Sequence, residues 1–328
     1  MPALLHNLCG AAAVALRGGL LADPPCCRYT ERNNARPSTK GAGYFPLHVF
    51  ASIACASGKL LVLPGTDIPR QKVNRHTRGT GDVDVVLSSG FLSFANHSGF
   101  LEAVEENGFK VKAIMGTSAG ALTGSLYAAG YTPKEVAFLL SKDPPYKLLR
   151  LAWPWEGGLL SMKPAINRLK ELLPPTFEEL PTEFACGVVC RDGSHRVINS
   201  GALPEAVVAS AAIPVLFAPV RIPGQGGGPF KDGGKVDRIG LKQWRDFLRS
   251  KSGKPEPPAL VHLIGRSSPF SGNDNICGNE LGVTVVRCPK SGVSLFSLGD
   301  FNAQRIIAKE VWPRFAATAH RLPGDAAL

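Results

Sequence analysis

The sequence contains no long uninterrupted apolar segment. Arg17 breaks the first apolar run and Lys59 breaks the second, so no stretch of about 20 residues has the composition of a membrane-spanning helix. Charged residues are few, at 19% of the chain, whereas hydrophobic residues make up 44%. This balance, without an internal repeat, excludes a coiled coil, a collagen and a wholly disordered chain. With 328 residues, the chain is long enough for one large domain or two small ones.

Acidic residues are scarce near the N-terminus. Residues 1–80 contain ten Lys and Arg but only three acids, a balance of +7 within the +11 of the whole chain. The segment is rich in Ala, Arg, Pro and Cys and shows no helical or strand periodicity before about Leu47, which is typical of an organelle transit peptide. We therefore expect residues 1–79 to be a disordered leader. Plastid targeting is favoured over mitochondrial targeting, with a cytoplasmic protein as the alternative.

Two other interpretations of this leader fit the residues less well. A secretory signal needs positive charge before its apolar stretch, whereas no Lys or Arg precedes Ala11 and Arg17 lies inside the stretch. A nucleic-acid-binding arm would interleave aromatic residues with its cations or form a compact basic cluster, and neither pattern occurs. We expect no nucleic-acid partner.

The eight cysteines follow no spacing typical of a disulfide framework. Cys186 and Cys190 lie four residues apart in an apolar run, with His195 five residues later, so a metal site has to be weighed against buried structural thiols. No motif supplies a fourth ligand, which favours buried thiols. The acids show no calcium-binding spacing either. We predict neither a metal nor a cofactor.

Short apolar runs alternate with amphipathic segments from Val83 onward. Strands are predicted over 83–87, 111–115, 183–189, 195–199, 259–264 and 283–287. Helices are predicted around residues 100–107, over 119–129, 134–140 and 165–173, and from 302 to about 320 with a break near Pro313. Thr132 and Pro133 are expected to begin the third helix. Residues 224–228 (GQGGG) lack the Lys-Ser or Lys-Thr of a phosphate-binding loop and are expected to form a flexible hairpin or loop. The alternation predicts an α/β fold, with a parallel sheet covered by helices.

The most informative segment is 113–127, AIMGTSAGALTGSLY. Gly116-Thr117-Ser118-Ala119-Gly120 is a G-x-S-x-G between a predicted strand and a predicted helix, which is the context of a nucleophile elbow. Side chains two residues before and after the serine would collide at so sharp a turn, which explains both glycines. The helix N-terminus would favour an oxyanion at this point. We predict that Ser118 is a nucleophile; a Gly-rich structural turn is the alternative.

A second motif, Asp232-Gly233-Gly234, follows the segment 209–220, ASAAIPVLFAPV. An Asp-Gly-Gly turn alone is commonly structural, but its combination with the elbow is informative. In these motifs the sequence resembles the patatin-like phospholipase family, whose elbow is G-x-S-x-G and whose second motif is Asp-Gly-Gly or Asp-Gly-Ala. The resemblance spans about residues 83–240. It implies a three-layer α/β/α fold with a mainly parallel central sheet, which we expect over residues 80–328.

The resemblance also implies a Ser-Asp dyad without histidine. Ser118 would be the nucleophile, and Asp232 the general base that takes its proton and returns it to the leaving alcohol. A carboxylate is a weak base for a hydroxyl, so Asp232 is expected to be buried with a raised pKa. The implied activity is a serine acyl hydrolase of the lipase or phospholipase A type, acting on membrane glycerolipids. A triad completed by His262 or His320 is the alternative mechanism, and His97 is expected to be structural.

The loop expected to form the oxyanion hole departs from the family pattern. The family places Gly-Gly-Gly-x-Arg-Gly after the first strand, whereas residues 88–94 read SSGFLSF. Gly90 alone survives of the glycines, and Ser93 stands in the place of the arginine. Because any residue except proline offers a backbone N–H, Gly90 and Phe91 remain candidate oxyanion donors. Phe91, Leu92 and Phe94 are candidates for lining an acyl channel or for plain core packing. A catalytically weak or inactive lipid-binding scaffold is therefore the alternative function.

Residues 146–162, YKLLRLAWPWEGGLLSM, interleave Lys147 and Arg150 with apolar residues that include Trp153 and Trp155. Tryptophan favours the interface of a bilayer, and cations favour anionic headgroups. The segment therefore predicts either a peripheral membrane contact near the site or a buried helix with ordinary tryptophan packing.

Overall fold

The structure is a computed structural model, and it describes residues 81–252, 258–266, 271–276, 282–290, 292, 296–297 and 299–311. The predicted leader, the end of the last predicted helix and the candidate triad residue His320 lie outside these residues. Their predictions therefore remain predictions.

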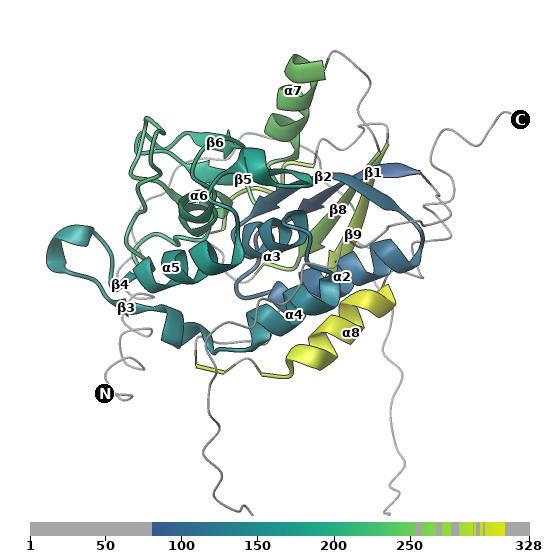
Figure 1. Cartoon of the computed structure of the whole chain (residues 1–328), viewed down its shortest axis with the longest axis horizontal. Coiled ribbons are helices and arrows are strands. Elements are labelled where there is room, and N and C mark those ends of the chain that lie inside the picture. Colours follow the sequence, from purple (N-terminus) through teal and green to yellow (C-terminus); the bar gives the residue numbers. More distant parts are fainter. Residues whose placement is uncertain are drawn as a thin grey trace, which may run out of the picture. The chain divides into compact units, whose positions relative to one another are not determined.

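A mainly parallel sheet lies at the centre of the described part of the chain (Figure 1). Its strands are β1 (Asp82–Leu87), β2 (Lys110–Thr117), β5 (Glu183–Val189), β6 (His195–Ile198), β7 (Lys231–Asp232), β8 (Ala259–Ile264) and β9 (Val283–Cys288). The strand order is β6-β5-β2-β1-β8-β9, and β7 pairs with β5. β5, β2, β1, β8 and β9 are parallel, whereas β6 and β7 run antiparallel to β5. Parallel neighbours need crossover connections, which explains why helices separate them in the sequence.

Side chains of the sheet alternate between two hydrophobic clusters. Val85 and Leu87 belong to one cluster, and Val86 between them belongs to the other. The first cluster includes residues of α2 (Phe94–Glu106), α3 (Ala119–Ala128) and α6 (Leu203–Ser210). The second includes Leu241 and the fully buried Trp244 of α7 (Leu241–Ser252), which lies on the opposite side of the sheet in Figure 1. The expected three-layer α/β/α arrangement is confirmed.

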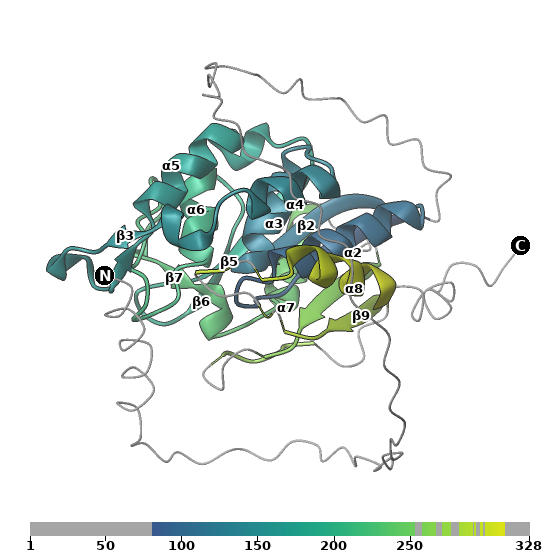
Figure 2. The same cartoon turned by 90° about the horizontal axis from the view of Figure 1, so that it is seen from below.

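Three further helices pack against the helices of the first cluster: α4 (Pro133–Ser141), α5 (Lys163–Leu172) and α8 (Phe301–Val311). Thr132 begins α4 as predicted, in a capping box with Glu135. α8 runs beside α2 in both Figure 1 and Figure 2. The two helices approach closely because Gly99 has no side chain; an added Cβ would collide with the carbonyl oxygen of Arg305. Arg305 also pairs with Glu102, which is buried.

The tryptophan-rich segment forms an exposed hairpin. The prediction of a buried helix with ordinary tryptophan packing is therefore wrong. It contains η1 (Pro145–Leu148), β3 (Arg150–Leu151), η2 (Pro154–Glu156) and β4 (Leu160–Ser161), and it projects at the left edge of Figure 1. Trp153 and Trp155 are 57% and 77% exposed, and their rings stack at 5.3 Å between centroids. Pro154 and the Gly157-Gly158 pair explain the failure of the helix, because both residue types interrupt helical backbone.

Candidate active site

Ser118 lies at the turn between β2 and α3. Its backbone angles are φ 56° and ψ −117°, which is a strained conformation for a residue with a side chain. An added Cβ on Gly116 would lie 2.6 Å from the carbonyl oxygen of Gly120, and one on Gly120 would collide with the carbonyl oxygen of Leu87. The two glycines are therefore required by close packing, as their spacing around the serine predicts.

Ser210, at the end of α6, holds this turn in place. The N–H of Ser118 donates to Ser210 Oγ at 3.0 Å, and Ser210 Oγ donates to the carbonyl oxygen of Gly187 at 2.6 Å. The strained turn is thereby tied to β5. Sequence reasoning gave Ser210 no role of its own, because both of its hydrogen-bond partners lie far from it in the sequence.

The register of the sheet brings Asp232 to Ser118. Thr117, the last residue of β2, pairs with Gly187 of β5, and the next residue of β5, Val188, pairs with Asp232 of β7. Asp232 is buried, and a hydrogen bond joins the Ser118 hydroxyl to its carboxylate. Asp232 Oδ1 also accepts the N–H of Gly234 at 2.7 Å.

Burial raises the pKa of Asp232 to about 6, although the hydrogen bonds from Ser118 and Gly234 oppose that change. The carboxylate is thus a stronger base than an exposed aspartate while it remains largely ionised at neutral pH. This environment matches the one expected for a carboxylate that must accept a proton from a hydroxyl.

The two glycines after Asp232 begin η4 (Gly233–Lys235) and permit two close contacts. An added Cβ on Gly233 would collide with the carbonyl oxygen of Gly187, and one on Gly234 would lie 2.6 Å from Ser89 Cβ. The Asp-Gly-Gly segment therefore packs against β5 on one side and against the loop after β1 on the other.

Some backbone amides of the loop after β1 have no protein acceptor in the described part of the chain. The N–H of Ser88 donates to the carbonyl oxygen of His262 at 3.1 Å, and that of Ser89 donates to the carbonyl oxygen of Arg238 at 2.7 Å. Those of Gly90 and Phe91 make no such bond there. At the start of α3, Ala119 and Gly120 likewise have no acceptor within the helix. These amides are the candidate oxyanion donors.

The backbone of this loop does not require the glycines that the family pattern places there. The one residue of the loop with a positive φ is Leu92, at 53°, so the side chains at Ser89, Phe91 and Phe94 cause no left-handed strain. Gly90 is needed for space instead, since an added Cβ would lie 2.8 Å from the side chain of Ile264.

His97 and His262 form a buried pair away from the dyad. His97 Nε2 donates to the carbonyl oxygen of Ser88 at 3.0 Å, so its Nδ1 accepts from His262 Nδ1 at 2.9 Å. Burial lowers the pKa of His97 to about 3 and holds that of His262 well below its usual value, so both rings are neutral. The structural role expected for His97 is confirmed. Among the described residues, no hydrogen bond links either histidine to Ser118 or Asp232.

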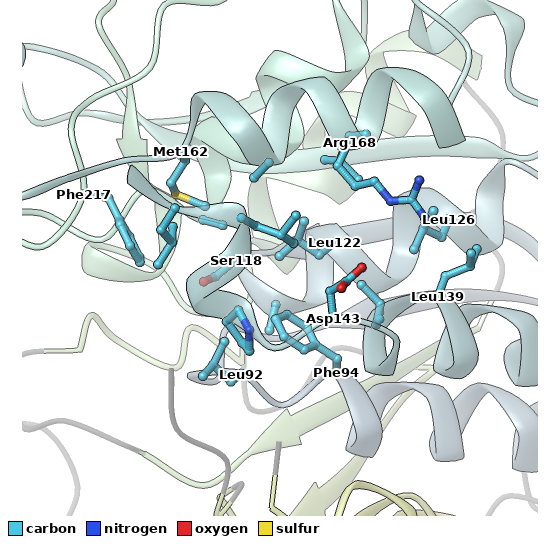
Figure 3. A pocket seen from close by; sticks show the side chains of 18 of the residues that line it. Leu92, Phe94, Ser118, Leu122, Leu126, Leu139, Asp143, Met162, Arg168 and Phe217 are labelled. Atoms are coloured by element: carbon cyan, nitrogen blue, oxygen red, sulfur yellow. The ribbon is translucent and has the colours of Figure 1, made fainter. Parts of the chain in front are cut away.

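An apolar cavity of about 120 Å³ opens beside Ser118. In Figure 3, Leu122 lies between Ser118 on one side and Asp143 and Arg168 on the other. Leucines of α3, α4 and α5 contribute to the lining, namely Leu122, Leu126, Leu139, Leu140, Leu169 and Leu172. Phe91, Leu92 and Phe94 also line the cavity, in agreement with the acyl-channel prediction.

The two cysteines that were weighed as metal ligands lie in the hydrophobic core. Cys186 and Cys190 are buried and unpaired, and burial raises the pKa of the Cys186 thiol. Both belong to the first hydrophobic cluster, in agreement with structural thiols. No group of three or more side chains that could hold a metal occurs within the residues that the structure describes.

Comparison with known proteins places residues 85–243 in the patatin-like phospholipase family model. Uncharacterized NTE family proteins of Mycobacterium bovis and Mycobacterium tuberculosis are 30% identical over 161 residues, which are 48% of this chain and 44% of each relative. The uncharacterized protein YqhO of Bacillus subtilis is 40% identical over 67 residues, 20% of this chain and 23% of that protein. The matches thus span less than half the length of these relatives.

Two solved structures are similar at low sequence identity. VipD from Legionella pneumophila is 16% identical, with a TM-score of 0.44, over 73% of this chain and 67% of VipD. The type III effector protein ExoU is 15% identical, with a TM-score of 0.37, over 72% of this chain and 53% of that protein.

Proposed function

The chain carries a domain of the patatin-like phospholipase family, and on that premise we propose that it is a serine acyl hydrolase that releases fatty acids from membrane glycerolipids. One observation carries the proposal: the hydroxyl of Ser118, held in a strained turn, is hydrogen-bonded to the buried carboxylate of Asp232 beside an apolar cavity. Nucleophile, base and acyl-binding space therefore meet at one place.

The reaction follows from this arrangement in two steps. Ser118 Oγ attacks the ester carbonyl while Asp232 takes its proton, and the resulting oxyanion is stabilised by the amides of Gly90, Phe91 and Ala119. Collapse of this intermediate breaks the ester bond, and Asp232 returns the proton to the leaving alcohol. Water then attacks the acyl-enzyme with Asp232 again as base, which releases the fatty acid and restores Ser118.

The cavity supports an acyl chain as the bound part of the substrate. Leucines from three helices line it, and each methylene buried there contributes about 0.8 kcal/mol of binding. Because Ser118 lines the cavity, an acyl chain inside it can hold its ester carbonyl at the nucleophile.

We further propose that the hairpin of β3 and β4 docks this cavity onto a lipid surface. β4 adjoins the segment that contains Val215 and Phe217: Leu159 N–H donates to the carbonyl oxygen of Val215, and Phe217 lines the cavity. Five apolar side chains are exposed on these two segments, namely Leu151, Trp153, Trp155, Leu159 and Val215. Within the described residues, no helix is long and apolar enough to span a membrane.

Fatty-acid release by the full-length chain tests the proposed function. Vesicles of phosphatidylcholine, and separately of a galactolipid, are incubated with the wild type, Ser118→Ala and the control Ser141→Ala, whose hydroxyl bonds only its own helix at Phe138. We expect release by the wild type and the control, and none by Ser118→Ala. Vesicle binding without release from either lipid would favour the non-catalytic scaffold instead.

A further inference from the structure

Arg238 lies behind the loop that offers the candidate oxyanion donors. Its side chain is 2% exposed. Nη2 donates to the carbonyl oxygen of Ser89 at 3.0 Å and also to that of Ile264, while Nη1 donates to Asp274 Oδ1 at 2.7 Å. One guanidinium group therefore joins the loop after β1, the end of β8 and a half-buried counter-charge.

The contact with Ser89 determines where the next amide points. The Ser89–Gly90 peptide bond is trans, and in a trans peptide the C=O and the following N–H point in opposite directions. Because Arg238 holds the Ser89 carbonyl, the Gly90 N–H is directed away from Arg238. The backbone of Arg238 also accepts the Ser89 N–H at 2.7 Å, so both peptide planes that flank Ser89 are fixed.

The same segment carries the candidate base. Arg238 follows Asp232 by six residues, and between them Gly234 packs against Ser89. Gly234 N–H in turn bonds the Asp232 carboxylate. The positions of the base and of the oxyanion loop are thus set by one stretch of chain, from residue 232 to residue 238.

We propose that Arg238 is a positioning residue of the oxyanion hole, which aims the Gly90 amide by holding the Ser89 carbonyl. This inference rests on the proposed acyl-hydrolase function.

Arginine suits this position for a geometric reason. Its planar guanidinium donates several hydrogen bonds in fixed directions, so it can hold two carbonyl oxygens and a carboxylate together, which the ammonium group of lysine does less well. Asp274 compensates the buried charge and also contacts Arg266 at 3.3 Å. Arg266 does not bond Ser89, and its side chain is 44% exposed. It is therefore a matched control that touches the same carboxylate.

The test compares steady-state kinetics of the full-length wild type, Arg238→Met, Arg238→Lys and Arg266→Met with p-nitrophenyl butyrate. Misplacement of one oxyanion donor is expected to lower kcat of Arg238→Met about 10- to 100-fold, with KM changed less than about 3-fold. Arg238→Lys should lose less, and Arg266→Met should stay within about 2-fold of the wild type. The pH at which kcat/KM falls should be unchanged, because Asp232 is untouched.

Three results would overturn the inference while leaving the function intact: an unchanged kcat in Arg238→Met, an equal loss in Arg266→Met, or a shift of the pH profile. Melting temperatures identify a variant that does not fold; if Arg238→Met fails in this way, Arg238→Lys carries the test with the same readouts. A wild type that hydrolyses neither this ester nor lipid vesicles contradicts the proposed function itself, and the inference falls with it.

Discussion

At the scale of single residues, the burial of Asp232 links its proposed role as a base to the stability of the fold. Its pKa of about 6 lies roughly two units above that of an exposed aspartate. Keeping this carboxylate ionised at pH 7 therefore destabilises the fold by on the order of 3 kcal/mol. Such a group is expected where reactivity has been favoured over stability.

The first prediction concerns the pH dependence of catalysis. The base must be ionised to accept a proton, so kcat/KM of the wild type should rise with pH through about 6 and level off above it. Asp232→Asn should lower kcat about 10²- to 10⁴-fold. His262→Gln, which changes a neutral buried ring, should retain the pH profile. A histidine triad would instead require His262→Gln to abolish hydrolysis.

The second prediction concerns stability. Between about pH 4 and pH 6 the folded state binds more protons at Asp232 than the unfolded state, so the free energy of unfolding falls as pH rises through this window. Asp232→Asn should therefore be more stable than the wild type at pH 7, and the difference should vanish below about pH 4. Urea unfolding at several pH values measures it. The exposed Asp246→Asn is the control, and an equal gain there would contradict the explanation.

Residue types and their spacing in the sequence predicted those site residues whose identity is dictated by local backbone geometry. Gly116 and Gly120 were identifiable because steric collision at a sharp turn leaves no other choice. The roles of Ser210 and Arg238 were not predicted, because they come from hydrogen bonds across segments distant in sequence.

At the scale of elements, strands with strong apolar runs were predictable. β5 and β8 have the predicted bounds, because both are apolar runs buried in the sheet. β7 was not predicted, since two residues carry no periodicity and their pairing with β5 is a tertiary contact. α6 and α7 were also missed. The predicted loop at residues 224–228 is confirmed.

The third prediction concerns the hairpin. Replacing Trp153 and Trp155 with alanine removes two exposed, stacked rings without altering the core, so folding should be unchanged while binding to anionic vesicles falls. Flotation of the full-length chain with phosphatidylglycerol vesicles measures this. Phe138→Ala, an exposed aromatic change on α4, should bind like the wild type. Undiminished flotation of the tryptophan variant would exclude the hairpin as the docking element.

At the scale of the whole molecule, strand order assembles the site. β1 and β2 are parallel neighbours, so the loop with the candidate oxyanion donors after β1 and the turn of Ser118 after β2 emerge at the same edge of the sheet. β5 lies on the other side of β2 and carries β7, which brings Asp232 to that edge. The alternation of elements predicted a parallel sheet, but the order of its strands depends on packing between distant segments and could not be predicted from this sequence alone.

The predicted leader and its organelle targeting lie outside the described residues, so the placement of the protein in the cell stays a prediction. The catalytic account does not depend on it, because the elbow, the oxyanion loop and Asp232 all lie within the described part of the chain.

Covalent labelling of Ser118 tests the central claim most directly. The full-length chain is treated with a fluorophosphonate, digested and mapped by mass spectrometry, with Ser118→Ala, Asp232→Asn and His262→Gln in parallel. The account predicts a single adduct on the Ser118 peptide, absent in Ser118→Ala, much slower in Asp232→Asn and undiminished in His262→Gln. A wild type that stays unlabelled, or Asp232→Asn labelled at the wild-type rate, would contradict it.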